Sequence, residues 1–342
     1  MKKHINIPLF IPHLGCPNQC VFCNQRAISG VCEFDPERVR DIIDESLATK
    51  SEDATAEIAF FGGSFTGIDR ELMIRLLSIA KEYVDKGLVK SLRCSTRPDY
   101  INDEILDILE KYSVSVIELG LQTASDEILI KTKRGHSFID EERAVRLITS
   151  RGFTLVGQMM IGLPGSTLDD EIKCAEFIIN SGAKYARIYP TVVFRGTELY
   201  SMTERGEYTP LALEEAVERS AVILSLLREN GVKVIRVGLC ASENLASEKT
   251  YFAGPNHPAL GELVENRVYL NKMEKLINEN YKEKPNAVEF LIPKGARSKV
   301  IGQRQCNIKR LSEQYGIKKV RLTESEGEND GIVTLIKQER KS

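Results

Sequence analysis

Residues 5–23 read INIPLFIPHLGCPNQCVFC and join an apolar run to three closely spaced cysteines. The run Ile5–Ile11 predicts a buried β-strand, and the spacing C-x3-C-x2-C places Cys16, Cys20 and Cys23 on the loop after it. Three thiolates on one loop can hold three irons of a [4Fe–4S] cluster and leave the fourth iron open to another ligand. The spacing therefore favours an iron–sulfur site at the end of the first strand.

Zinc is the alternative occupant of this motif. A structural zinc site needs four ligands, and the nearest further donors are His13 and Cys32, at an irregular spacing. The cysteines outside the motif are scattered, and we expect them to be small, buried apolar side chains. These five are Cys32, Cys94, Cys174, Cys240 and Cys306.

Apolar runs like the first one recur along the chain and alternate with amphipathic helical patterns. The predicted strands are Ile5–Ile11, Glu57–Phe61, Leu92–Ser95, Ser115–Leu121, Thr154–Ile161, Tyr185–Tyr189 and Val232–Val237. Helices are predicted between them, for example over Pro36–Ala48, Asp69–Val84 and Asn102–Lys111. This alternation indicates an α/β fold with a parallel sheet, and six repeats predict a partial (β/α)6 TIM-like barrel. Ligand chemistry is then expected at the carboxyl ends of the strands.

The pattern changes after Cys240. A turn cluster at Ala253–Pro258 precedes a predicted helix over Leu263–Asn278. A strand over Ala287–Pro293, a basic loop and a second helix over Arg304–Tyr315 are then predicted. Two further strands are predicted over Lys319–Leu322 and Ile332–Ile336. We expect a barrel over residues 1–240, a linker and helical extension over 241–285, and a small α+β module over 286–342.

Composition excludes several classes of protein. The 342 residues are 42% hydrophobic and 28% charged, which is typical of a globular chain. The net charge of −2 predicts no attraction of the whole molecule to nucleic acid or anionic lipid. No apolar run is long enough to span a bilayer, and the apolar part of the first residues is too short and broken for a signal peptide. We expect a cytoplasmic protein without a membrane partner.

The cysteine motif, with an aromatic residue before its last cysteine at the end of a first strand, resembles the radical S-adenosylmethionine (SAM) superfamily. In that family SAM chelates the open iron through its amino and carboxylate groups, and electron transfer cleaves its sulfonium to a 5′-deoxyadenosyl radical. The resemblance implies that Cys16, Cys20 and Cys23 hold a [4Fe–4S] cluster. It also implies that Phe22 lies beside the adenine of SAM.

Motifs at later strand ends narrow the resemblance. The pair Gly62-Gly63 resembles the family's glycine motif that holds the SAM amino group. Together with residues 95–99, 118–123, 133–137, 158–165, 187–191 and 195–200, it resembles the radical SAM domain of the Elongator catalytic subunit and its short bacterial relatives, over about residues 5–260. Relatives place a polar residue near SAM at the positions of Ser95, Gln122, Arg134 and Gln158, and many carry Glu where this chain has Ser95.

Other groups are expected to have structural or substrate-contact roles rather than catalytic ones; they are Lys133, His136, Glu198 and His257. No catalytic side chain is assigned from the sequence. The Elongator subunit also carries an acetyltransferase domain, and we expect this chain to be too short to hold one. We therefore do not assign the complete modification reaction of the Elongator subunit to this chain.

The carboxyl-terminal region is strongly basic. Residues 282–322 contain eleven Lys or Arg and three Glu, a local charge of +8. The sequence around Gly302 resembles a KH RNA-binding module, in which a GXXG loop before a helix clamps the nucleic-acid backbone. Gln305 occupies the second Gly position. The residues expected to contact RNA are Lys294, Arg297, Lys299, Gly302, Arg304, Lys309 and Arg310.

These features predict a radical SAM enzyme that modifies RNA, with tRNA as the expected substrate and a ferredoxin or flavodoxin as the electron donor. One alternative is a porphyrin-type radical oxidase similar to oxygen-independent coproporphyrinogen oxidase. Those enzymes carry a further Cys two residues after the third, where this chain has Gln25. Another alternative is an RNA-binding protein with a purely structural cluster, which would not cleave SAM.

Overall fold

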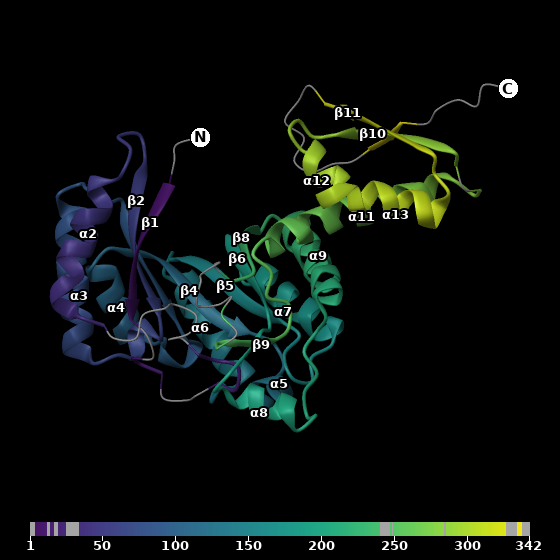
Figure 1. The fold of residues 1–342 in the computed structure, drawn as a ribbon. Helices are drawn as coiled ribbons and strands as arrows, with labels where there is room; N and C mark the ends of the chain where they lie inside the picture. Colours follow the sequence, from purple (N-terminus) through teal and green to yellow (C-terminus); the bar gives the residue numbers. More distant parts are fainter. Residues whose placement is uncertain are drawn as a thin grey trace. The chain divides into compact units, whose positions relative to one another are not determined.

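A parallel sheet of seven strands forms the larger part of the molecule (Figure 1). The structure is a computed structural model that describes residues 4–11, 14–16, 20–24, 34–239, 247, 249–283, 285–325 and 334–336. The strands lie in chain order and are β1 (His4–Ile11), β2 (Thr55–Gly62), β3 (Ser91–Thr96), β4 (Val114–Gln122), β5 (Thr154–Ile161), β6 (Tyr185–Pro190) and β8 (Lys233–Val237). All seven predicted strands are present, so the partial (β/α) barrel is confirmed, with β8 beside β6 as a seventh strand.

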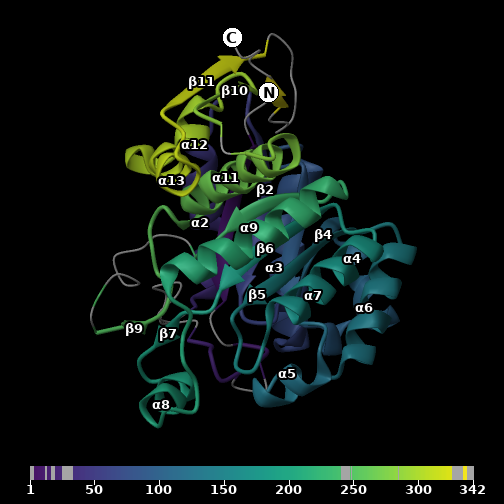
Figure 2. The same cartoon turned by 90° about the vertical axis from the view of Figure 1, so that its right-hand side faces the viewer.

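Helices connect these strands and cover one face of the sheet (Figure 2). They are α2 (Val39–Ala48), α3 (Arg70–Asp85), α4 (Asp103–Lys111), α5 (Asp126–Lys131), α6 (Phe138–Ser150) and α7 (Leu168–Asn180). A further helix, α9 (Leu213–Glu229), lies between β6 and β8 in the sequence. Right-handed crossovers between strands in sequential order place successive helices on the same face. Two predicted helix starts are confirmed, because Asp69 accepts a hydrogen bond from the Leu72 amide and Asn102 accepts one from the Ile105 amide, each at 2.9 Å. The helix predicted from Pro36 begins with a 3-10 turn over Pro36–Arg38 and is α-helical from Val39.

A small extension follows β6. It consists of β7 (Val193–Phe194), α8 (Glu198–Glu204) and β9 (Tyr251–Ala253), and β7 pairs antiparallel with β9. Val193 and Leu199 are buried in one apolar cluster with Val21, and Phe22 packs against that cluster. The extension therefore contacts the cysteine segment directly.

The chain forms two compact units. One contains Met1–Leu213 and Leu226–Asn256, and the other contains Glu214–Ser225 and His257–Ser342. The second unit has α11 (Leu260–Asn280), β10 (Ala287–Ile292), α12 (Arg297–Ile301), α13 (Cys306–Tyr315), β11 (Lys319–Glu324) and β12 (Thr334–Ile336). Its central strand β10 runs parallel to β11 and antiparallel to β12. Met273 of α11 is buried with Phe290, Val300 and Leu311, so α11 shares the core of this unit.

The predicted start of the last helix is wrong by two residues. The backbone φ angles of Arg304 and Gln305 are +52° and +61°, which a right-handed helix does not permit, and α13 begins at Cys306. The region predicted as a basic loop contains the short helix α12, which buries Val300. Within the described residues, no helix is long and apolar enough to cross a membrane.

Candidate active site

The three cysteines of the motif line a cavity of about 610 Å³ at the carboxyl ends of the strands. All seven residues predicted to surround SAM line the same cavity; they are Phe22, Gly62, Gly63, Ser95, Gln122, Arg134 and Gln158. They come from the loop after β1, from the ends of β2, β3 and β4 and, for Gln158, from within β5, with Arg134 on the segment after α5. Parallel strands thus bring together residues that are up to 142 positions apart in the sequence.

A close backbone crossing fixes the start of the cysteine loop. A Cβ atom on Gly15 would lie 2.2 Å from the carbonyl oxygen of Ser64, and one on Gly67 would lie 2.5 Å from the carbonyl oxygen of Gly15. Gly15 also has a φ of +75°, which glycine adopts without strain. Cys16 follows this crossing directly, and burial raises the pKa of its thiol.

Main-chain hydrogen bonds hold the middle of the cysteine segment from two sides. The Val21 amide donates to the carbonyl of Thr132 at 3.2 Å, and the Val21 carbonyl accepts from the Leu199 amide at 2.8 Å. Lys133, which follows Thr132, and Glu198, which precedes Leu199, form an ion pair at 2.6 Å. The end of α5 and the start of α8 therefore position the segment between Cys20 and Cys23.

Two arginines approach the sulfur of Cys20. Nη1 of Arg134 lies 3.3 Å from Cys20 Sγ, and Nη1 of Arg97 lies 3.9 Å from it. Arg134 also donates to the Gly120 carbonyl at 2.5 Å. Arg97 was not among the residues expected at the site, although its place in the motif at residues 95–99, at the end of β3, was a signal for it.

Local backbone strain directs Gln122 toward the cavity. The pairing of β4 with β5 shifts register between Gly120 and Gln122, and Gln122 has a φ of +74°. Such conformations cost about 1–3 kcal/mol and cluster at functional sites. A Cβ on Gly120 would lie 3.0 Å from the Gln122 amide nitrogen, so this glycine leaves room for the Gln122 side chain.

A buried charge network supports Gln158. Its amide nitrogen donates to Glu118 at 2.9 Å, and Arg187 lies 3.0 Å from the same carboxylate oxygen. Arg93 also pairs with Glu118 and lies 3.5 Å from Glu57. The Glu118 side chain is 1% exposed, so its charge is balanced inside the protein rather than by water.

Buried polar atoms without a hydrogen-bond partner indicate which ligands fit the cavity. The side-chain oxygen of Gln122 and the Nε of Arg134 are buried and have no hydrogen-bond partner. A carboxylate would satisfy the arginine, and an amino or hydroxyl group would satisfy the amide oxygen. SAM carries all three groups, and thiolates are the ligands of iron–sulfur clusters. The donor set therefore fits both cofactors by its chemistry. Cys16, Cys20 and Cys23 line one cavity, but in the described segments no three His, Cys, Asp or Glu side chains are grouped closely enough to hold a metal ion.

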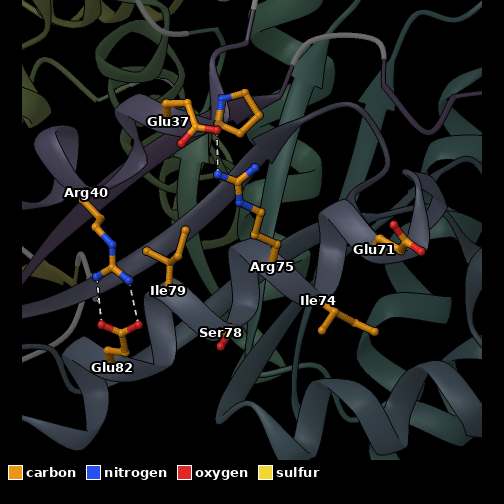
Figure 3. Close-up of a pocket in the computed structure, with 9 residues that line it drawn as sticks. Glu37, Arg40, Glu71, Ile74, Arg75, Ser78, Ile79 and Glu82 are labelled. Atoms are coloured by element: carbon orange, nitrogen blue, oxygen red, sulfur yellow. Dashed lines mark hydrogen bonds and ion pairs between the residues drawn. The ribbon is translucent and has the colours of Figure 1, made fainter.

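Another cavity of about 610 Å³ lies between α2 and α3 (Figure 3). Both of its arginines are paired with acids of the same lining, Arg40 with Glu82 at 2.7 Å and Arg75 with Glu37 at 2.6 Å. It contains none of the residues predicted from the sequence. The cysteine cavity is therefore the candidate site.

The histidines have local partners. The Nε2 atom of His136 lies 3.1 Å from Glu141, and burial lowers the pKa of His136 to about 4. The Nδ1 atom of His257 accepts a hydrogen bond from the Ala259 amide at 3.1 Å. The structural or substrate-contact roles expected for both stay predictions.

Of the scattered cysteines, Cys94 and Cys174 are buried as predicted, and burial raises the pKa of Cys94 to about 12. The prediction is wrong for Cys306, which is exposed at the start of α13. The remaining two, Cys32 and Cys240, lie outside the described residues, as does His13, the other zinc donor considered.

The residues predicted to bind RNA fall into two groups. Lys294, Lys299, Arg304 and Lys309 are exposed. Arg297 and Arg310 are also exposed but have partners within the protein: Arg297 donates to the Leu322 carbonyl at 2.8 Å, and Arg310 lies 3.4 Å from Glu274. Gly302 is buried, and a Cβ there would lie 2.5 Å from Cys306 Sγ. Gln305 adopts the left-handed conformation that a glycine at its position would favour.

Comparisons with known proteins identify the family of this chain. The radical SAM superfamily model matches residues 10–178, and the radical SAM C-terminal domain model matches residues 183–269. A tRNA uridine(34) acetyltransferase of Methanocaldococcus jannaschii is 39% identical over 131 residues, which are 37% of this chain and 24% of the relative. Protein YhcC of Escherichia coli K12 is 27% identical over 216 residues, 59% of this chain and 68% of the relative.

A solved structure supports the fold. The archaeal Methanocaldococcus infernus Elp3 with an N-terminal deletion has a TM-score of 0.63 at 22% identity, over 85% of this chain and 71% of that chain. The present chain spans about a quarter of the length of the acetyltransferase that it matches. From the two family models, the cysteine motif and the cavity, we conclude that the chain belongs to the radical SAM superfamily and is an enzyme of that family, with a [4Fe–4S] cluster and SAM as its cofactors.

Proposed function

We propose that this enzyme modifies RNA, with tRNA as its substrate, and that the cysteine cavity is where SAM is cleaved. The observation that carries the proposal is the convergence of three cysteines and two unpartnered polar atoms on one cavity. In this proposal Cys16, Cys20 and Cys23 ligate the cluster. A cluster held there would supply the single electron needed for reductive cleavage of the SAM sulfonium.

The other cavity residues are proposed to bind and orient SAM. Arg134 is a cation with an unpartnered Nε and suits the SAM carboxylate. The free oxygen of Gln122 suits the amino group or a ribose hydroxyl. Gly63 permits close approach of the backbone, and Phe22 offers an aromatic face to the adenine. Ser95 and Gln158 complete the polar lining.

The basic surface of the second unit supports RNA as the substrate class. Lys294, Lys299, Arg304 and Lys309 are exposed around the Gly302 turn, and all four side chains are long cations that can reach phosphates. The βααβ order of β10, α12, α13 and β11 is that of a KH-like module. The tRNA-directed names of the archaeal relatives point to tRNA within this class.

A one-electron donor of the ferredoxin or flavodoxin type is the proposed physiological reductant, because cluster reduction needs a single low-potential electron. A cytoplasmic location is proposed with it, since tRNA and such donors meet there. The absence of a membrane-spanning helix from the described residues is compatible with this location.

The deciding experiment is SAM cleavage by the anaerobically reconstituted protein. With dithionite as reductant, we expect 5′-deoxyadenosine, quantified by mass spectrometry, and faster formation when tRNA is added. Mass spectrometry of tRNA from a deletion strain should then reveal a missing modification. A protein that binds tRNA and holds four irons without forming 5′-deoxyadenosine would instead be an RNA-binding protein with a structural cluster.

The glycine pair allows a test of SAM binding that separates it from folding. Gly62 has a φ of +113°, and a Cβ there would lie 2.7 Å from the Ile11 carbonyl oxygen, so its substitution disturbs the sheet. Gly63 lines the cavity and has no positive φ. We expect Gly63→Val to raise the Kd of SAM by about tenfold or more, roughly 1.4 kcal/mol, without changing the unfolding midpoint. Calorimetry with SAM checks this, and an unchanged Kd would make the pair a structural turn only.

Salt dependence tests the RNA surface. Each phosphate neutralised on a single strand contributes a slope of about −0.7 in log K against log salt, so three or four contacts predict about −2 to −3. Replacing Lys299 and Arg304 by Ala should flatten this slope by about one to two units in filter binding of tRNA. Arg310→Ala is the matched control and should have a smaller effect, because Glu274 already pairs with it. An unchanged slope in the double variant would contradict the RNA surface.

A further inference from the structure

Arg97 is a buried cation whose side chain is held in one orientation. It follows β3, and its side chain is 6% exposed. Its Nε and Nη2 atoms donate to the two carboxylate oxygens of Asp99, each at 2.9 Å, and Nη2 also donates to the carbonyl of Arg134. These bonds leave Nη1 directed at the sulfur of Cys20, at 3.9 Å.

The surroundings keep this arrangement rigid. The Arg97 amide donates to Ser64 Oγ at 3.2 Å, and Ser64 Oγ lies 2.9 Å from the hydroxyl of Thr96. On the other side, Nδ1 of His136 lies 3.4 Å from Arg97 Nη2 and 3.6 Å from Asp99. Because burial lowers the pKa of His136 to about 4, the imidazole is neutral near pH 7 and adds no charge. Arg97 therefore contributes a guanidinium close to the sulfur, with the Asp99 carboxylate behind it, and the guanidinium of Arg134 lies 3.3 Å from the same sulfur.

We propose that Arg97 and Asp99 set the reduction potential of the cluster bound through Cys20. One-electron reduction makes the cluster and its thiolates more negative by one charge. A fixed guanidinium beside the sulfur stabilises the reduced state, and the carboxylate behind it opposes that effect. Hydrogen bonds and net charge near the sulfurs are recognised determinants of cluster potentials. This inference rests on the proposed ligation of the cluster by Cys16, Cys20 and Cys23.

Arg97 is a better candidate for this role than Arg134. Arg134 approaches Cys20 more closely, but its Nε is free and faces a ligand in the proposed SAM site. Its contacts therefore change when SAM binds. Arg97 has its Nε and Nη2 committed to Asp99 and keeps its charge at a constant place.

The test is a redox titration of the reconstituted protein without SAM, followed by electron paramagnetic resonance of the reduced cluster. Arg97→Gln should lower the equilibrium constant for reduction at least about tenfold, which is about 59 mV for one electron. Asp99→Asn should raise the constant, since it removes the opposing charge while an oxygen still accepts from Arg97. Arg97→Lys should fall between wild type and Arg97→Gln. Arg40→Gln, at the distant α2–α3 groove, is the matched control and should leave the potential unchanged.

An electrostatic role predicts that the Arg97 and Asp99 variants shift the reduction potential in opposite directions, which a purely structural role does not. If both variants hold four irons and shift the potential in the same direction, or not at all, the inference is overturned. If Arg97→Gln loses its cluster, the upward shift in Asp99→Asn still decides the question. A wild-type protein that assembles no cluster would overturn the proposed ligation itself, and that result is visible from iron content before any titration.

Discussion

Replacing Cys20 with Ala is expected to abolish SAM cleavage. The wild-type protein should bind about four irons per chain, because three thiolates hold three irons and the fourth remains open to SAM. Cys20 lies between Cys16 and Cys23 in the motif, and its sulfur faces the cavity with both arginines beside it. Without this thiolate we expect iron content to fall to near zero and 5′-deoxyadenosine formation to fall below detection. Iron analysis and mass spectrometry measure the two effects.

The same loss is expected for Cys16→Ala and Cys23→Ala. Cys306→Ala is the matched control, since Cys306 is exposed on α13 in the other unit and is expected to leave both measurements unchanged. Cys32→Ala should also retain the cluster, because the motif assigns only three ligands. Loss of the cluster in Cys32→Ala as complete as in Cys20→Ala would contradict the three-ligand assignment.

Replacing Glu118 with Leu is expected to destabilise the barrel strongly. The Glu118 carboxylate contacts Arg93, Arg187 and Gln158 in the interior of the sheet. Removing one partner from a buried charge network leaves uncompensated charge, which typically costs about 3–5 kcal/mol. We expect a correspondingly lower urea midpoint, followed by far-ultraviolet circular dichroism. Weaker SAM binding should accompany it, because Gln158 loses the acceptor that orients its amide.

A surface ion pair provides the control for this prediction. Arg151 contacts Asp103 and Asp107, both of which are largely exposed. Exposed pairs are screened by water, so Asp107→Asn should leave the urea midpoint unchanged within error. Equal effects of the Glu118 and Asp107 substitutions would show that burial of the Glu118 network does not contribute to stability.

The sequence was sufficient to predict the sheet. The central strand β5 is largely buried on both sides and appears as an apolar run, whereas the edge strand β1 buries Ile7, Leu9 and Ile11 on one side. The helices between the strands show an amphipathic period. Polar capping residues such as Asp69 and Asn102 mark helix starts by local hydrogen bonds. These signals depend on neighbouring residues only, which is why they can be read from one sequence.

The cavity lining was also predictable, because carboxyl ends of successive parallel strands lie at the same edge of a sheet. This rule explains why motifs after five strands line one cavity together with Cys16. The last helix was predicted less well. The positive φ angles of Arg304 and Gln305 follow from the turn at Gly302, where the buried backbone packs against Cys306 and Asn307.

Only the tertiary structure showed the charges that surround the site. The partners of Arg97 include Cys20 and His136, which are 77 and 39 positions away in the sequence. Glu118 is likewise balanced by arginines on two other strands, and Arg310 by an acid on α11. An arginine on a solvated surface and one buried against a sulfur have the same local sequence pattern. The sequence therefore determined the sheet and the lining of the cavity, whereas the pairing of its charges was decided by packing, since an ion pair depends on distance in space and on exclusion of water.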